Sequence, residues 1–210
     1  MKPRYNFCKN AVITSALLIG CLALSCCDAN KHFERAEDYD QKGQDSLAIC
    51  ELTKAIESDP FFARAYFRRG MIYGRRCEYD SAILDYSMAI ECGLLGAEVY
   101  VMRATAYLNR GILDLAVRDC TKAIELDSTL AYAYYFRGTA HYLKLDYTSA
   151  IEDQTRAIGL RLDFAEAYNA RGTLYLLVGE HELAKKDLLM ANRINPLLPV
   201  YPEQRAIIGL

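Results

Sequence analysis

Small apolar residues recur along most of the chain at a fixed interval of 34 residues. In each copy, further apolar residues lie three and four positions apart, which is the spacing of one face of an α-helix. The copies follow one another without insertion or deletion, and each predicts two helices joined by a short turn. Alanine occupies one of the recurring positions five times, at Ala48, Ala82, Ala116, Ala150 and Ala184. The repeats span 29–62, 63–96, 97–130, 131–164 and 165–196.

The second repeat illustrates how one unit is built. Tyr66, Gly70 and Tyr73 share one face of a predicted first helix, and Ala82 and Ala89 share one face of a second. Small residues let antiparallel helices approach closely, while tyrosines fill the space beside them. A single hairpin cannot bury its own apolar face, so each repeat must pack against the next. The sequence therefore predicts an all-α fold, an α-solenoid of five helix-turn-helix units.

This pattern resembles the tetratricopeptide repeat (TPR), which has the same 34-residue period. The resemblance covers residues 29–196 and includes the repeat-ending prolines Pro60 and Pro196. It implies a right-handed superhelix whose first helices line a concave groove. The chain departs from the family pattern because tyrosine or histidine stands at the usual tryptophan position. The middle repeats also end without proline, at Leu94, Ser128 and Leu162.

The last repeat has the polar face that a terminal repeat needs. Lys185 and Asn192 replace the valine and isoleucines of the earlier copies. In the tail, 197–210, the prolines leave room for a short helix near 203–208. Its apolar residues are expected to cover the remaining apolar surface of the array; they are Leu197, Leu198, Val200, Ile207 and Ile208.

Each repeat carries one arginine in its first helix and one acid in its second. An arginine beside a packed Gly or Ala position is expected to be partly buried and to need a carboxylate. We therefore interpret the repeated arginines and acids as structural ion pairs and not as a surface that binds phosphate groups. The arginines are Arg35, Arg69, Arg103, Arg137 and Arg171, and the acids are Glu51, Asp85, Asp119, Asp153 and Asp187.

The N-terminus has the parts of a secretory signal. Three basic residues precede an uncharged apolar stretch, and Asp28 is the first acid. The motif Ala23-Leu24-Ser25-Cys26 resembles a bacterial lipobox, as does Leu18-Ile19-Gly20-Cys21. The resemblance implies a signal peptide over 1–25, lipidation of Cys26 (alternatively Cys21) and a lipid-anchored protein of the bacterial cell envelope. An ordinary cleaved signal and an uncleaved N-terminal anchor remain alternatives.

Composition narrows the function classes. The 25 Lys and Arg residues nearly balance 27 Asp and Glu, so the charge gives no reason to expect nucleic-acid binding. No catalytic or phosphate-binding motif occurs, and the three histidines lack a metal-ligand spacing. We therefore expect no enzyme activity, no metal and no cofactor. Whether the mature cysteines Cys50, Cys77, Cys92 and Cys120 form a disulfide is left open.

The groove is the surface that remains for function. Tyrosine is a common binding anchor, which favours a scaffold that binds a protein or peptide segment. A carbohydrate- or small-molecule-binding accessory protein is the alternative, and the tail or a neighbouring molecule could also cover the tyrosines. The sequence does not predict the oligomeric state. The resemblance places these residues in the groove: Phe67, Met71, Val101, Thr105, Leu108, Tyr132, Tyr135, Thr139, Tyr142, Asn169, Thr173 and Leu176.

Overall fold

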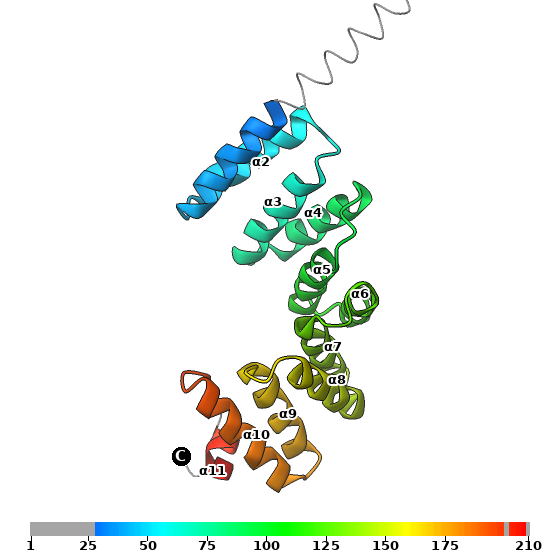
Figure 1. Cartoon of the computed structure of the whole chain (residues 1–210), viewed down its shortest axis with the longest axis vertical. Helices are drawn as coiled ribbons and strands as arrows, with labels where there is room; N and C mark the ends of the chain where they lie inside the picture. The colour runs from blue at the N-terminus through cyan, green and yellow to red at the C-terminus, as the bar shows by residue number, and fades with distance from the viewer. Residues whose placement is uncertain (1–27, 200–201, 209–210) are drawn as a thin grey trace, which may run out of the picture. The chain divides into compact units, whose positions relative to one another are not determined.

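The computed structural model describes residues 28–199 and 202–208, and all regular secondary structure in these residues is helical. Residues 28–41 are helical and precede α2, which spans Asp45–Ser58 (Figure 1). The first helices of the next four repeats begin at Ala63, Ala97, Ala131 and Ala165, the first residues of the predicted units. The all-α fold class is confirmed. The other helices are α2 (Asp45–Ser58), α3 (Ala63–Arg75), α4 (Tyr79–Glu91), α5 (Ala97–Asn109), α6 (Leu113–Leu126), α7 (Ala131–Leu143), α8 (Tyr147–Leu160), α9 (Ala165–Leu177), α10 (His181–Ile194) and α11 (Pro202–Ile208).

The helices form two compact units, which divide between Leu94 and Leu95. The first unit holds repeats one and two, and the second holds repeats three to five with α11. Within the second unit, each first helix packs against its own second helix, and α6 and α8 also pack against the first helix that follows. The recurring alanines of the second helices, such as Ala116 and Ala150, are 0% exposed. The predicted stacking of repeats is therefore present inside each unit.

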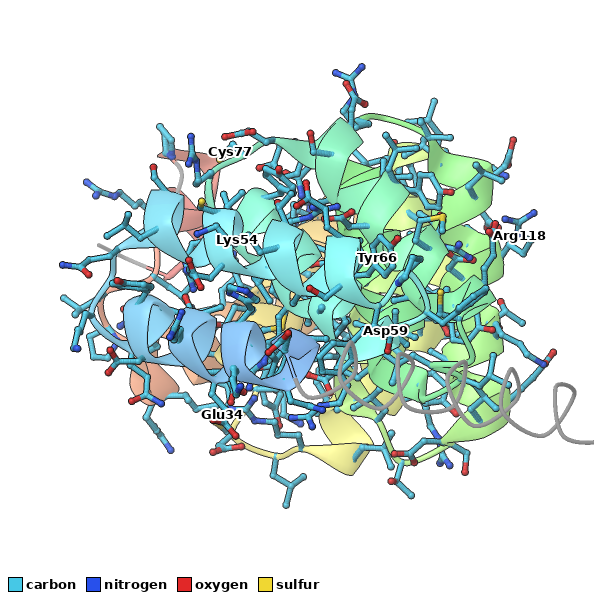
Figure 2. The ribbon with its side chains drawn as sticks, turned by 90° about the horizontal axis from the view of Figure 1, so that it is seen from above. Glu34, Lys54, Asp59, Tyr66, Cys77 and Arg118 are labelled. Carbon is cyan, nitrogen blue, oxygen red and sulfur yellow. The ribbon has the colours of Figure 1, made fainter. Side chains whose placement is uncertain are left out.

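The turn inside every repeat contains one residue with a left-handed backbone, again at intervals of 34. Gly43, Gly111 and Gly179 hold three of these positions, but Cys77 and Leu145 hold the others with φ of 60° and 64°. The next residue donates its backbone N–H to a carbonyl five residues earlier, as in Glu78 to Tyr73 at 2.8 Å. This bond closes the end of the first helix in the manner of a Schellman motif. Figure 2 labels Cys77 at this turn.

Close helix contact explains the glycines of the first helices. A Cβ added at Gly172 would lie 2.9 Å from Cγ of Leu188, and one at Gly138 would lie 2.8 Å from Nε2 of Gln154. Such distances are shorter than van der Waals contact, so these helices meet through the bare backbone. The same place in the third repeat holds Ala104, opposite the smaller Cys120. Burial raises the pKa of the Cys120 thiol to about 12, which makes it a packing group and not a nucleophile.

The predicted ion pairs form in repeats two to five. In the fifth repeat, Arg171 donates from Nε and Nη2 to both oxygens of Asp187, at 2.7 and 2.9 Å. Its remaining Nη1 donates to Thr155 of the preceding repeat at 3.0 Å. The bidentate pair therefore fixes one hairpin and also ties it to its neighbour. Arg69–Thr53 and Arg137–Thr121 repeat this link at 2.9 and 3.3 Å.

The first repeat departs from the ion-pair prediction. Arg35 is 65% exposed and its Nη1 lies 4.0 Å from Glu51, so it is not the partly buried arginine that we expected. Glu51 instead accepts hydrogen bonds from Lys54 at 2.6 Å and His32 at 2.7 Å, which lower its pKa. Among the described residues, no earlier repeat supplies a hydroxyl to hold the Arg35 side chain in place.

The tail forms the expected short helix, α11, which packs against α10 (Figure 1). Ile207 is partly buried, but Leu197 is 91% exposed and covers nothing, contrary to the prediction. Leu197 follows Pro196 in a turn, where its backbone N–H donates to Oδ1 of Asn195 at 3.1 Å. Val200 lies outside the described residues, and so does the Ile208 side chain.

Candidate functional site

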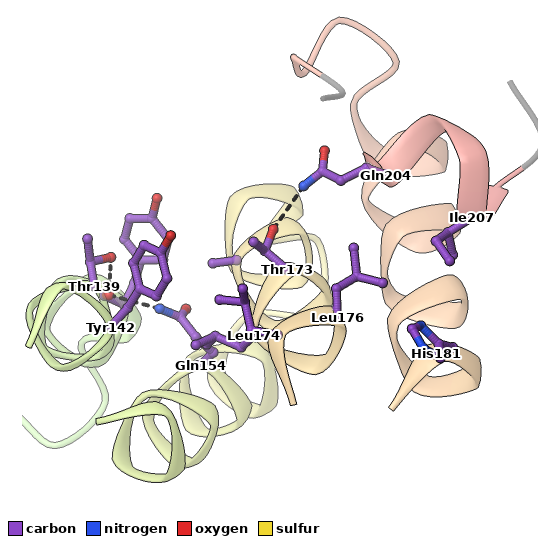
Figure 3. A pocket seen from close by; sticks show the side chains of 12 residues that line it. Thr139, Tyr142, Gln154, Thr173, Leu174, Leu176, His181, Gln204 and Ile207 are labelled. Carbon is purple, nitrogen blue, oxygen red and sulfur yellow. Dashed lines mark hydrogen bonds between the residues drawn. The ribbon is translucent and has the colours of Figure 1, made fainter. Parts of the chain in front are cut away.

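The second unit contains a cavity of about 830 Å³, which we call the α7–α9 cavity. The first helices of repeats four and five form two of its walls, and Gln154 of α8 lies between them (Figure 3). The tail contributes Gln204 and Ile207 of α11. Its lining residues are Tyr135, Thr139, Tyr142, Gln154, Ala170, Thr173, Leu174, Leu176, Leu177, His181, Gln204 and Ile207.

Aromatic packing holds the tyrosine side of the cavity. The Tyr135 ring lies 5.2 Å from Phe136 and 5.0 Å from Phe164, which is 1% exposed. These distances are within the usual range for aromatic pairs. Burial raises the pKa of Tyr135, so its phenol stays protonated. Tyr142 is 36% exposed and gives the cavity an accessible aromatic surface.

The threonine hydroxyls of the cavity are already engaged as donors. Thr139 donates to the carbonyl of Tyr135 at 2.9 Å, and Thr173 donates to that of Asn169 at 2.8 Å. The Thr173 hydroxyl also accepts a hydrogen bond from Nε2 of Gln204 at 2.8 Å (Figure 3). Gln204 is 2% exposed, so this bond anchors α11 at the edge of the cavity. The tail therefore contacts Thr173, one of the predicted groove residues, while Tyr142 stays 36% exposed.

The α7–α9 cavity brings together five of the twelve predicted groove residues. They are Tyr135, Thr139, Tyr142, Thr173 and Leu176.

Two further predicted residues line a second cavity of about 760 Å³. Val101 is 3% exposed there and packs with Ala123 and Ala133, so little of it is available to a ligand. Tyr132 is 43% exposed, and its hydroxyl accepts a hydrogen bond from Arg161 at 2.7 Å.

The other five predicted residues line neither cavity. Phe67 belongs to the first unit, where its ring lies 5.8 Å from Tyr86. Thr105 donates its hydroxyl to the carbonyl of Val101 in its own helix, at 2.9 Å. Their role in binding stays a prediction, as it does for Met71, Leu108 and Asn169.

Sequence reasoning missed the cavity residues that are not on the predicted face of a first helix. Leu174 and Leu177 flank that face, and Ile207 reaches the cavity from the tail. Gln154 carried a signal that could have identified it. Its equivalents at intervals of 34 residues are Leu52, Tyr86, Cys120 and Leu188, so it is the polar member of an otherwise apolar or aromatic set.

The structure adds three findings about other kinds of site. Within residues 28–199 and 202–208, no group of three His, Cys, Asp or Glu side chains could hold a metal ion. None of the helices described there is both long enough and apolar enough to cross a membrane. The described cysteines, Cys50, Cys77, Cys92 and Cys120, are free thiols. The predicted signal peptide, with Cys21 and Cys26, lies outside the described residues.

The tetratricopeptide repeat family model matches residues 97–130 and 165–196, which are the third and fifth predicted repeats. A solved structure of MamA is similar over 83% of this chain and 98% of its own, with 22% identity and a TM-score of 0.74. The fold is that of a tetratricopeptide repeat protein. No curated protein matches the sequence.

Two other TPR-like structures are similar over most of their length. YrrB, described as a TPR protein with an unusual peptide-binding site, has 22% identity and a TM-score of 0.70 over 81% of this chain and 88% of its own. PilW, described as a widely conserved type IV pilus biogenesis factor, has 17% identity and a TM-score of 0.75 over 86% of each chain. At these identities the likeness concerns the fold. TPR proteins are in general interaction scaffolds and not enzymes.

Proposed function

We propose that this TPR protein is a non-enzymatic scaffold that binds a segment of another protein at the α7–α9 cavity. The observation that carries the proposal is the convergence of five predicted groove residues, from two neighbouring repeats, on one largely apolar cavity. Its volume of about 830 Å³ is within the range of ligand-binding sites. Tyr142 offers a stiff aromatic surface of the kind that anchors protein interfaces. The peptide-binding site of the similar protein YrrB lends support to this class of partner.

A site-specific photocrosslinker tests this proposal. A benzoylphenylalanine in place of Tyr142 should crosslink to a discrete protein in the cells that make this chain, and mass spectrometry of the product should map one segment of it. The matched control places the same crosslinker at Leu162, which is 75% exposed and lines neither cavity. Equal crosslinking from both positions, or none from Tyr142, would contradict the proposal.

We further propose that a lipid on Cys26 tethers the scaffold to an envelope membrane. The basic start, the apolar stretch and the small residue before Cys26 support this. More than one acyl chain would give stable anchoring, which a single chain does not. A role in envelope assembly is a natural extension, because PilW, a protein of similar fold, is described as a pilus biogenesis factor.

Metabolic labelling with palmitate tests the tether. We expect labelling of the wild type, loss in Cys26→Ser and retention in Cys21→Ser. Loss in Cys21→Ser alone would move the anchor to the alternative cysteine. A wild-type protein that takes up no labelled palmitate would contradict lipidation at either cysteine.

A further inference from the structure

The tail helix α11 lies on the surface where the partner segment is proposed to bind. Nε2 of Gln204 donates a hydrogen bond to the hydroxyl of Thr173, one of the predicted groove residues, at 2.8 Å (Figure 3). Ile207, three residues further along α11, lines the same cavity. Residues three apart share one face of a helix, so α11 presents one face to the fifth-repeat side of the α7–α9 cavity. The chain thus holds a segment of its own at this part of the groove.

The contact has the form of a bound ligand. α11 follows the last repeat, and it lies against the first helix α9 through Thr173 as well as against the second helix α10. The Thr173 hydroxyl donates to the carbonyl of Asn169 and accepts from Gln204. A partner segment that bonds to Thr173 in the same way needs the place that the Gln204 side chain occupies.

Three features make α11 easy to displace. It has seven residues, which is too short for a helix to persist in water without docking. Gln204 is 2% exposed but polar, so on release its amide exchanges a hydrogen bond with the protein for one with water at a small net cost. Ile207 is only partly buried, and Leu197, where the tail begins, is 91% exposed. A permanent cap is expected to bury more apolar surface than this.

We infer that α11 is an intramolecular ligand of the fifth repeat, which competes with the partner segment for the Thr173 side of the α7–α9 cavity. This inference rests on the proposed function and adds a regulation to the same site. Because the tail is covalently attached, its effective concentration at the cavity is high even though its contacts are weak. A partner segment therefore binds in proportion to the fraction of molecules from which α11 has been released. Tyr142, on the other side of the cavity, is accessible while α11 is docked (Figure 3).

Substitutions in the tail test this competition in the full chain. Gln204→Ala removes the amide that holds α11, so capture of the partner segment from the crosslinker at Tyr142 should rise by about fivefold, at an irradiation time when capture by the parent chain is far from complete. The matched control is Leu197→Ala, which changes an exposed tail residue that lines neither cavity and should alter capture by less than about twofold. Unchanged capture in Gln204→Ala would overturn the inference. Loss of capture would also overturn it, because α11 would then be a wall that the partner needs.

A synthetic peptide of residues 197–210 tests whether the tail and the partner use the same surface. Added to an extract of the same cells at a millimolar concentration, which is the order expected for an attached tail, it should reduce capture by the Gln204→Ala chain at least about twofold. The matched peptide carries the Gln204→Ala substitution itself, and it should compete less because it lacks the donor for Thr173. Equal competition by both peptides, or none by the unsubstituted one, would contradict the inference.

Hydrogen exchange of the purified full chain separates release of α11 from unfolding of the repeat. In Gln204→Ala the amides of α11 should exchange about fivefold faster, while those of α7, α8 and α9 keep the protection that they have in the wild type. Faster exchange throughout the fifth repeat would show that Gln204 belongs to the core of that repeat, and an unchanged rate in α11 would show that Gln204 does not hold the helix. Either result would overturn the inference.

Failure of this inference is distinguishable from failure of the proposed function. If the crosslinker at Tyr142 captures a discrete segment in the parent chain and Gln204→Ala does not increase the yield, the scaffold proposal stands and the competition falls. If neither chain captures a segment although hydrogen exchange shows that α11 is released, the scaffold proposal falls and the competition falls with it.

Discussion

Repeats four and five share the parts that build the hairpin, and two of the positions at which they differ are compared here. Both have a glycine at the helix crossing, Gly138 and Gly172, and both have a bidentate arginine–aspartate pair. The fourth repeat, however, has Gln154 where the fifth has Leu188, and Leu145 where the fifth has Gly179. The shared parts are what the hairpin needs in order to fold. At both differing positions we expect the fourth repeat to be locally less stable, and one of them, Gln154, lines the cavity.

The largest effect should come from the shared ion pairs. Arg171→Ala should lower the free energy of unfolding by about 3 kcal/mol, because it leaves Asp187, 4% exposed, without its bidentate partner. Arg137→Ala should cost somewhat less, since Nε2 of His141 lies 4.0 Å from Asp153 and can compensate in part. Urea unfolding of the full chain measures both changes.

Arg35→Ala is the matched control for these pairs. Arg35 is 65% exposed and its Nη1 lies 4.0 Å from Glu51, so we expect the free energy of unfolding to fall by less than about 0.5 kcal/mol. A loss as large as that of Arg171→Ala would show that exposure does not decide the strength of these pairs.

The second-largest effect should come from giving the fifth repeat the glutamine that the fourth repeat has at the equivalent position. Leu188→Gln puts an amide at the fifth repeat's packing position, where Leu188 is 3% exposed and lies close to Gly172. We expect a loss of about 2 kcal/mol from lost apolar contact and an incompletely bonded amide. Thermal melting gives the change. No change would mean that any repeat can host this amide, which would remove the special status of Gln154.

The contrast between these repeats also shows how far sequence alone could predict the molecule. The 34-residue period specified the helices because packing demands recur in every unit, and the arginine–acid rows were predicted as pairs for the same reason. Arg35 was misjudged because His32 and Lys54 bond Glu51 in its place, and the 34-residue pattern does not indicate this exchange of partners.

The site was less predictable than the fold. The resemblance identified residues on first helices, such as Tyr135 and Thr173, but not Gln154, whose importance depends on a bond to the Tyr135 carbonyl and on an oxygen left unbonded. Ile207 could not be found from periodicity, because the tail lies outside the repeats and reaches the cavity through tertiary packing.

The third-largest effect should come from the opposite substitution, which gives the fourth repeat the leucine of the fifth. Gln154→Leu removes a buried, partnerless oxygen and restores the residue type that packs opposite glycine in the fifth repeat. The lost hydrogen bond to Tyr135 offsets part of the gain, so we expect stabilisation by about 1 kcal/mol. A higher urea midpoint would show that the amide at this position lowers the stability of the hairpin. Destabilisation by the same amount would show instead that the amide is a structural part of the hairpin.

The smallest effect concerns the turn. Leu145 has φ of 64°, in the region where Gly179 sits with φ of 83° in the fifth repeat, and it is 71% exposed. Leu145→Gly should therefore relieve backbone strain while losing little packing, and the greater freedom of glycine in the unfolded chain reduces the net gain to about 0.5 kcal/mol. The matched reverse change, Gly179→Leu, should destabilise by about 1 kcal/mol. Melting temperatures that move in opposite directions would establish that the turn position acts alike in both repeats.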